Sequence, residues 1–73
     1  MENGIYRHYK GEKYKVLAVA KHSETLEDMV VYQAIYGSGE IWVRPLSMFC
    51  QTVESGGQLV PRFAKLDESE GQE

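Results

Sequence analysis

The sequence predicts a small all-β domain, and three observations support that prediction. Short runs of β-branched and aromatic residues recur along the chain, and MVVYQAIY at residues 29–36 is an example. Turn signals separate these runs, of which GSGE at residues 37–40 is the clearest. The length of 73 residues suits one domain. Together these features favour a small β-barrel of about five short strands.

The strands are expected to follow one another with short connections. Gly11 suits the turn after the first strand, and residues 23–28 form a polar loop in which Thr25 and Asp28 resemble a capping pair for one helical turn. Pro45 should end a strand and begin a 3₁₀ turn over residues 45–49. The predicted strand segments are residues 4–10, 14–22, 29–36, 41–44, 50–53 and 60–66, the last broken by Pro61.

The long segment at residues 14–22 alternates in an uneven way. One set of positions holds Tyr14, Val16, Ala18, Ala20 and His22, and the other set has lysines at both ends with apolar residues between them. A strand that bends partway along a small barrel gives this pattern.

Charge is distributed unevenly along the chain. The net charge is −3, yet the first 21 residues carry five bases against two acids. Residues 67–73 hold four acids and no base, and we expect this tail to be disordered beyond a single domain at residues 1–66. The basic third is a local patch, weaker than the footprint of a dedicated nucleic-acid binder. No apolar run approaches a membrane span, and the single Cys50 fits a reducing cytoplasm.

Several segments together resemble a known family. They are YRHYKG, HSET, VVY, WVRP and PRF, which span the chain in this order. The series is similar to a small bacterial family catalogued as a domain of unknown function, number sixteen fifty-three. The resemblance covers residues 4–66 and implies an SH3-like β-barrel. It implies no activity, so it assigns no catalytic or binding role to any residue. Ala18 and Cys50 depart from the family pattern without altering the prediction.

The residues offer little support for catalysis, a metal or a cofactor. His22 and Ser23 are neighbours, whose side chains would point to opposite faces of a strand, so they make a poor nucleophile–base pair. Cys50 with His8 or His22 stays open, but a lone cysteine is more often a buried small hydrophobe. No metal-ligand spacing and no phosphate loop are present. In HSET, we favour a structured turn over a ligand-facing loop that uses His22 and Glu24.

Aromatic and arginine side chains are the remaining candidates for function. Trp42 and Arg44 share one face of their strand, either in an aromatic groove or half-buried on the outer surface with Ile41 and Val43 in the core. The tyrosines either pack across strands or line a groove. Within YRHYKG, alternation separates Tyr6 and His8 from Arg7 and Tyr9. The candidate ligand-binding residues are Tyr6, His8, His22, Glu24, Tyr32, Tyr36, Trp42, Arg44 and Arg62.

These candidates lead to three hypotheses of function. We favour a non-catalytic module that binds a peptide or small ligand through its aromatic and arginine side chains. The first alternative is an RNA- or single-stranded-DNA-binding module that uses the basic N-terminal third. The second is a small enzyme or enzyme accessory that uses His22 and Glu24. No cofactor, metal or membrane partner is expected, and the chain is predicted to be a monomer or a weak homodimer.

Overall fold

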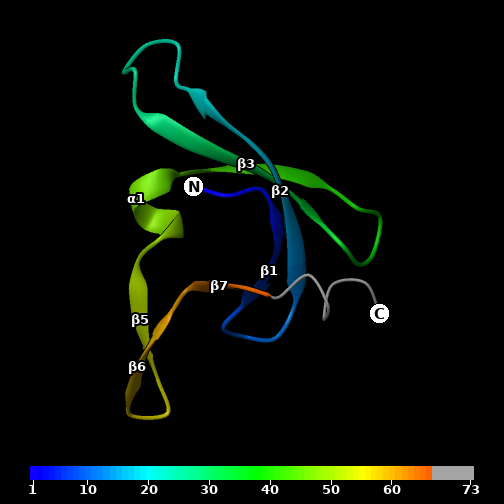
Figure 1. Ribbon diagram of the computed structural model, residues 1–73, viewed down its shortest axis with the longest axis vertical. Helices are drawn as coiled ribbons and strands as arrows, with labels where there is room; N and C mark the ends of the chain where they lie inside the picture. The colour runs from blue at the N-terminus through cyan, green and yellow to red at the C-terminus, as the bar shows by residue number, and fades with distance from the viewer. Residues whose placement is uncertain (67–73) are drawn as a thin grey trace.

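The computed structural model describes residues 1–66, which form seven strands and one short helix (Figure 1). The acidic tail at residues 67–73 lies outside the described residues. The all-β prediction is therefore confirmed, while strand ends differ by a few residues from those expected. The elements are β1 (Gly4–His8), β2 (Lys13–Lys21), β3 (Asp28–Ala34), β4 (Ile41–Pro45), α1 (Leu46–Phe49), β5 (Thr52–Ser55), β6 (Gln58–Pro61) and β7 (Phe63–Lys65).

The strands form two sheets. The larger sheet has five antiparallel strands in the order β4-β3-β2-β1-β7, and the smaller is the β5–β6 hairpin. Because β4 and β7 are the edges of the larger sheet, the described residues do not form the closed barrel that we expected. The β5–β6 hairpin extends away from the larger sheet, below α1 in Figure 1.

The core lies on one face of the five-stranded sheet. In β3, Val30, Tyr32 and Ala34 are buried at alternate positions, as the period of two requires for a strand with one covered face. Phe49 of α1 covers this face, and its ring stacks on that of Phe63 with centroids 4.0 Å apart. The buried cluster consists of Tyr6, Val16, Val30, Tyr32, Phe49 and Phe63.

A β-bulge in β2 explains the uneven alternation of residues 14–22. Val16 pairs with Tyr32, but the next pair is Ala18 with Val31, so Leu17 is the extra residue. The predicted bend is present, but the side chains that follow it lie on the opposite face of the sheet from the one that we expected. After the bulge Ala18 no longer shares a face with Val16, since one inserted residue exchanges the two faces.

The C-terminal segment contains two strands where we expected one. The prediction of a single edge strand at residues 60–66 is wrong, because the chain changes partners at Arg62. Pro61 ends β6, which pairs with β5, and Phe63 begins β7, which pairs with β1. The Arg62 N–H donates to the carbonyl oxygen of Gln51 at 2.8 Å, which holds the chain at this switch.

Local turns follow the sequence with two exceptions. Gly37 and Gly39 take positive φ values of 58° and 71° in the turn before β4, as the GSGE signal predicts. Residues 46–49 form a turn of α-helix rather than the 3₁₀ turn expected. The loop between β2 and β3 contains a single helical turn, closed by the Leu26 N–H and the His22 carbonyl oxygen, but Thr25 does not cap it; instead Thr25 Oγ1 accepts a hydrogen bond from the Glu27 N–H. Within residues 1–66, no helix is long and apolar enough to cross a bilayer.

Candidate functional site

Four of the predicted site residues meet at one pocket, and a fifth residue joins them. Tyr14 of β2, Tyr32 of β3, and Trp42 and Arg44 of β4 contribute side chains from neighbouring strands, and Tyr36 adds one from the following turn. The pocket has a volume of about 220 Å³. Tyr32 and Trp42 are directly opposite each other in the β3–β4 register, which explains why their side chains share this face. We call the surface formed by Tyr14, Tyr32, Tyr36, Trp42 and Arg44 the aromatic groove.

Hydrogen bonds and ring contacts hold the groove in shape. The hydroxyls of Tyr14 and Tyr36 are 2.6 Å apart, and Arg44 Nε donates to the Tyr32 hydroxyl at 3.3 Å. The ring of Tyr14 contacts those of Tyr32 and Tyr36 edge-on, with centroids 5.4 and 5.5 Å apart. Burial, and then the hydrogen bond with Tyr36, raise the pKa of Tyr14. Its phenol therefore stays protonated and available as a donor.

Among residues 1–66, Arg44 supplies the only charge that lines this pocket. The two ion pairs found among residues 1–66 are Lys21 with Asp28 and Lys65 with Glu2, so neither occupies Arg44. Its side chain is only partly exposed, and its guanidinium has donors beyond Nε. An arginine on an aromatic surface without a carboxylate is suited to a planar acidic group.

Trp42 lies on the inner face of β4, where it lines the aromatic groove. Its side chain is 49% exposed, whereas Ile41 and Val43 on the other face are 59% and 62% exposed. The alternative in which Ile41 and Val43 fill the core is therefore wrong, and the groove position is the one observed. The physical reason is that β4 lies at the edge of the sheet, where the described residues leave its outer face uncovered.

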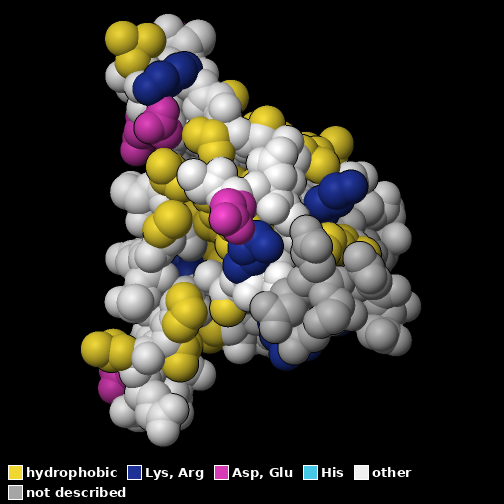
Figure 2. Space-filling view, in the orientation of Figure 1, with side chains coloured by type: hydrophobic (Ala, Val, Ile, Leu, Met, Phe, Trp, Pro, Cys, Tyr) yellow, Lys and Arg dark blue, Asp and Glu magenta, His cyan; other side chains and the backbone are white. Residues whose placement is uncertain are grey.

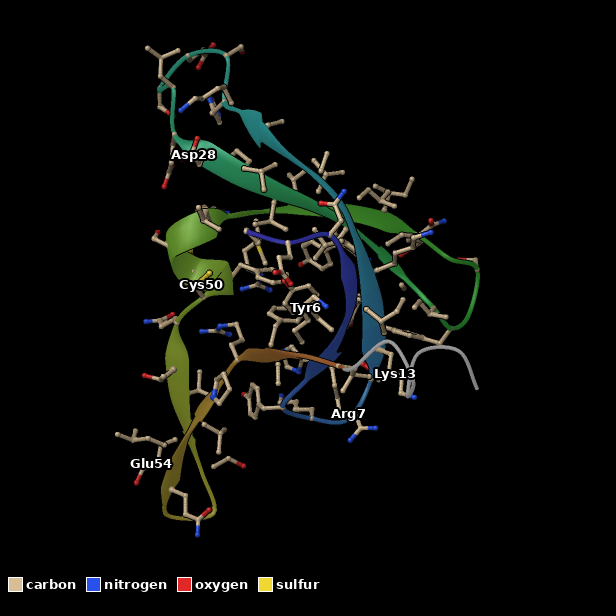
Figure 3. The ribbon with its side chains drawn as sticks, in the orientation of Figure 1. Tyr6, Arg7, Lys13, Asp28, Cys50 and Glu54 are labelled. Atoms are coloured by element: carbon tan, nitrogen blue, oxygen red, sulfur yellow. The ribbon has the colours of Figure 1, made fainter. Side chains whose placement is uncertain are left out.

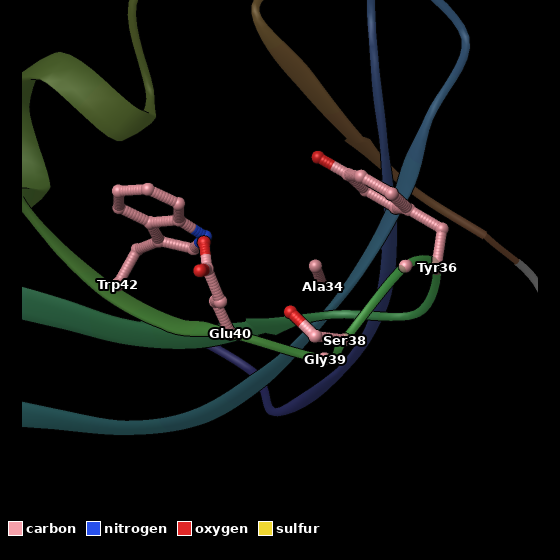
Figure 4. Close-up of a pocket in the computed structure, with 7 residues that line it drawn as sticks. Ala34, Tyr36, Ser38, Gly39, Glu40 and Trp42 are labelled. Carbon is pink, nitrogen blue, oxygen red and sulfur yellow. The ribbon is translucent and has the colours of Figure 1, made fainter.

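A second pocket of about 180 Å³ adjoins the groove and shares Tyr36 and Trp42 with it. Figure 4 shows Glu40 next to Trp42 on the same side of the chain, with Ser38 and Gly39 in the turn between them and Tyr36. Glu40 is exposed and adds a negative charge to this end of the surface. The two adjoining pockets together thus run from a carboxylate at Glu40 to a guanidinium at Arg44.

Tyr6 and His8 lie away from the groove opening. Tyr6 is 7% exposed, and its hydroxyl donates to the carbonyl oxygen of Glu2 at 2.7 Å, so it belongs to the core (Figure 3). The His8 ring is half-buried against Phe63, with centroids 4.9 Å apart. Burial, and then the charges of Arg62, Arg44 and Lys10, lower the pKa of His8.

His22 and Glu24 are engaged within their own loop. His22 Nδ1 accepts hydrogen bonds from the N–H groups of Glu24 and Thr25 at 3.1 and 3.3 Å. The Glu24 side chain is exposed. This arrangement is the structured turn that we favoured for HSET, since the histidine orders backbone groups beside it.

Arg62 and Cys50 have surroundings that the sequence does not reveal. The Arg62 Nη2 donates to Gln51 Oε1 at 3.0 Å, while its buried Nε has no hydrogen-bond partner among the described residues. Cys50 is exposed directly after α1, so the expectation of a buried small hydrophobe is wrong. Phe49 takes the buried position beside it. No group of three metal-ligating side chains occurs within residues 1–66.

Tyr14 is the groove residue missing from the predicted set. Its position two residues before the buried Val16, on the same strand face, is the signal that could have identified it. The basic residues of the first third lie elsewhere: Arg7 and Lys13 are exposed and opposite each other on the face away from Tyr6 and Tyr14 (Figure 3). Figure 2 shows charges of both signs interspersed on the viewed face, without a continuous basic stripe.

Comparison with known proteins identifies the family. The sequence model of a family described as a protein of unknown function, DUF1653, matches residues 4–65. The chain belongs to this family. A solved structure, described as a DUF1653 protein from Bordetella bronchiseptica, is 38% identical to the chain, with a TM-score of 0.84. The match covers 90% of this chain and 87% of that chain. No curated protein matches the chain. The family is described as one of unknown function, so membership assigns no activity to the chain.

Proposed function

We propose that this chain is a non-catalytic binding module whose aromatic groove takes a short extended peptide or a small ligand. The observation that supports this most directly is the convergence of three tyrosines, Trp42 and Arg44 on one open pocket. Large aromatic side chains with a polar end are the residues that dominate binding surfaces. Trp42 is 49% exposed beside the three tyrosines, and an exposed apolar patch of this kind favours a role in recognition.

The chemistry of the groove indicates what the ligand carries. The ring faces of Trp42 and Tyr36 suit a flat or aliphatic group, and the two pockets together offer room for one or two side chains. Arg44 suits a carboxylate or another planar anion at one end. The ligand is therefore expected to combine an apolar or aromatic group with an acidic group a short distance away.

A peptide selection tests this function. A phage library of random twelve-residue peptides would be selected on the immobilised full chain, and enriched peptides would be synthesised and titrated against the wild type and each variant by isothermal titration calorimetry. We expect enrichment of peptides with an acidic and an aromatic residue. Trp42→Ala should weaken their binding by about thirtyfold, or about 2 kcal/mol, as for an interface hot spot.

Ile41→Ser is the matched control for this experiment. Ile41 is the strand neighbour of Trp42 but points to the opposite face and is 59% exposed, so its loss should leave binding unchanged. The proposal would be overturned by a selection whose peptides bind the Trp42→Ala and Arg44→Gln variants as tightly as the wild type.

The two other functions have less support. Nucleic-acid binders combine basic and aromatic side chains on one surface, whereas Arg7 and Lys13 lie on the opposite face from Tyr14. An enzyme that uses His22 as a base would need a ring nitrogen with a free lone pair. Nδ1 accepts two backbone hydrogen bonds in its loop, and Nε2 of that tautomer carries the hydrogen. The finer fold assignment, an SH3-like barrel, stays a prediction from the family resemblance.

A further inference from the structure

The outer edge of β4 carries backbone groups that the sheet does not use. The Ala34 N–H donates to the Glu40 carbonyl oxygen at 2.9 Å, which fixes the alternation along this strand pair. Trp42 and Arg44, two and four residues further on, therefore direct their backbone groups toward β3. Ile41 and Val43 direct theirs to the free edge, because successive residues of a strand face opposite ways in the ladder. Pro45 has no N–H, and its carbonyl oxygen accepts the first hydrogen bond of α1 because Pro45 is the N-cap.

The features that keep sheet edges apart are confined to the C-terminal end of this five-residue edge, at Arg44 and Pro45. Edge strands are usually short, charged, covered or interrupted, since free N–H and C=O groups pair readily with another chain. The side chains of Ile41, Trp42 and Val43 are 59%, 49% and 62% exposed, and none carries a charge. Residues 41–43 of this edge are therefore extended and apolar, and no strand within residues 1–66 pairs with them there.

We propose that two copies of this chain associate through antiparallel pairing of their β4 edges, with Val43 opposite Val43 of the partner subunit. The two Val43 residues then exchange two hydrogen bonds. This register satisfies the Val43 N–H and carbonyl oxygen of each edge. Ile41 gains no hydrogen bond, because Pro45 lacks an N–H and its carbonyl oxygen is the N-cap acceptor of α1.

Charge complementarity on the inner face favours a second copy as the occupant. In this register Trp42 is directly opposite Arg44 of the partner subunit, which is a cation–π arrangement. Glu40 is the diagonal neighbour of the same arginine and within reach of its long side chain. Among residues 1–66, neither Glu40 nor Arg44 has an ion pair in its own chain. Pairing gives each of them a partner of opposite charge.

The outer face of β4 would add apolar contacts to the dimer interface but would bury little surface area. Ile41 and Val43 of the two copies would form a continuous apolar strip across the symmetry axis. Two five-residue strands bury less than the roughly 800 Å² per partner of a stable interface. The dimer is therefore expected to be weak and reversible, dissociating in the range of about 10–100 µM.

Charge exchange within the full-length chain tests this arrangement. Glu40→Lys and Arg44→Glu each place like charges on neighbouring positions of the two copies, and each should weaken the dimer at least tenfold. The double variant Glu40→Lys/Arg44→Glu restores opposite charges across the interface, so it should recover association. Sedimentation equilibrium from about 5 µM to about 1 mM measures all four proteins, and circular dichroism confirms that each is folded.

Val43→Pro provides an independent variant. Val43 donates no hydrogen bond within its own sheet in this register, so proline there removes only the two central bonds between the copies. We expect it to be a folded monomer. The proposal would be overturned by a wild type that stays monomeric at about 1 mM, or by a double variant no more associated than the single ones.

This inference goes beyond the proposed function and shares Glu40, Trp42 and Arg44 with its two pockets. Val43→Pro keeps every side chain of the aromatic groove, so peptide binding by this monomer tests the groove alone. Loss of the dimer with retained peptide binding would separate the two proposals. If the chain never self-associated and its β4 edge instead paired with an extended peptide, the dimer would be contradicted.

Discussion

At the scale of single residues, His8 shows how the fold sets a charge state. Its Nδ1 accepts a hydrogen bond from the Lys10 N–H at 3.2 Å, so the neutral ring carries its proton on Nε2. The ring packs edge-on to Phe63 and 6.4 Å from the ring centre of Tyr14. Burial is the main cause of its lowered pKa, and the nearby arginines add to it.

A lowered histidine pKa makes stability depend on pH. The unfolded state takes up a proton near its ordinary value of 6.5, whereas the folded state does so only at lower pH. The contribution of neutral His8 is therefore fully present above a pH of about 6.5 and is lost as the pH falls toward the folded pKa. Urea unfolding at several pH values should show wild-type stability decreasing on acidification, and His8→Gln decreasing less.

Both proteins in that comparison retain His22 and all carboxylates, so the difference between them reports on His8. Identical pH profiles for wild type and His8→Gln would contradict the lowered pKa.

At the scale of elements, the loop between β2 and β3 combines order and strain. The Leu26 N–H donates to the His22 carbonyl oxygen at 2.8 Å, and the His22 N–H donates to that of Glu27. Leu26 takes a φ of 64° and is 69% exposed, so it occupies a left-handed conformation without burying its side chain. A leucine there is costly, because its Cβ crowds the following carbonyl.

Replacing this leucine by glycine should stabilise the protein. We expect Leu26→Gly to raise the free energy of unfolding by about 0.5–1 kcal/mol, since glycine adopts positive φ without the crowding of Cβ. Leu59→Gly is the control: Leu59 is 78% exposed in β6, where glycine weakens an extended strand. Chemical denaturation measures both variants. A destabilising Leu26→Gly would contradict the assignment of strain to this residue.

The helix α1 contributes to stability mainly through one side chain. Phe49 is 1% exposed and contacts Tyr6, Tyr32 and Phe63 through its ring. We expect Phe49→Ala to reduce the free energy of unfolding by about 3–5 kcal/mol, which is enough to unfold much of so small a domain. Met48→Ala, at a neighbouring position that is 44% exposed, should change it by less than about 0.5 kcal/mol. Thermal unfolding followed by circular dichroism compares the two.

At the scale of the whole molecule, the sequence predicts what depends on local pattern. The alternation of β3 and the glycine turn before β4 are local, and both were predicted. The bulge at Leu17 and the change of partner at Arg62 depend on which strands meet, and single-sequence patterns do not contain that information. The tertiary arrangement of the strands determines both features.

The candidate site follows the same division. Alternation placed Trp42 with Arg44 correctly, because both lie on one short strand. It could not decide that the shared face is the inner one, since β4 is an edge strand with two partly exposed faces. Tyr6 joined the core rather than the groove because Phe49 of the distant α1 packs on it, with ring centroids 5.5 Å apart.

The central claim is that the aromatic groove is the ligand-binding surface, and the single tryptophan tests it directly. In a ¹⁵N-labelled Val43→Pro monomer, the indole N–H of Trp42 gives one nuclear magnetic resonance signal. On titration with a selected peptide, we predict a saturable shift of this signal together with the backbone amides of Tyr36 and Arg44. An indole signal that stays in place while the amides of Arg7 and Lys13 shift would contradict the account.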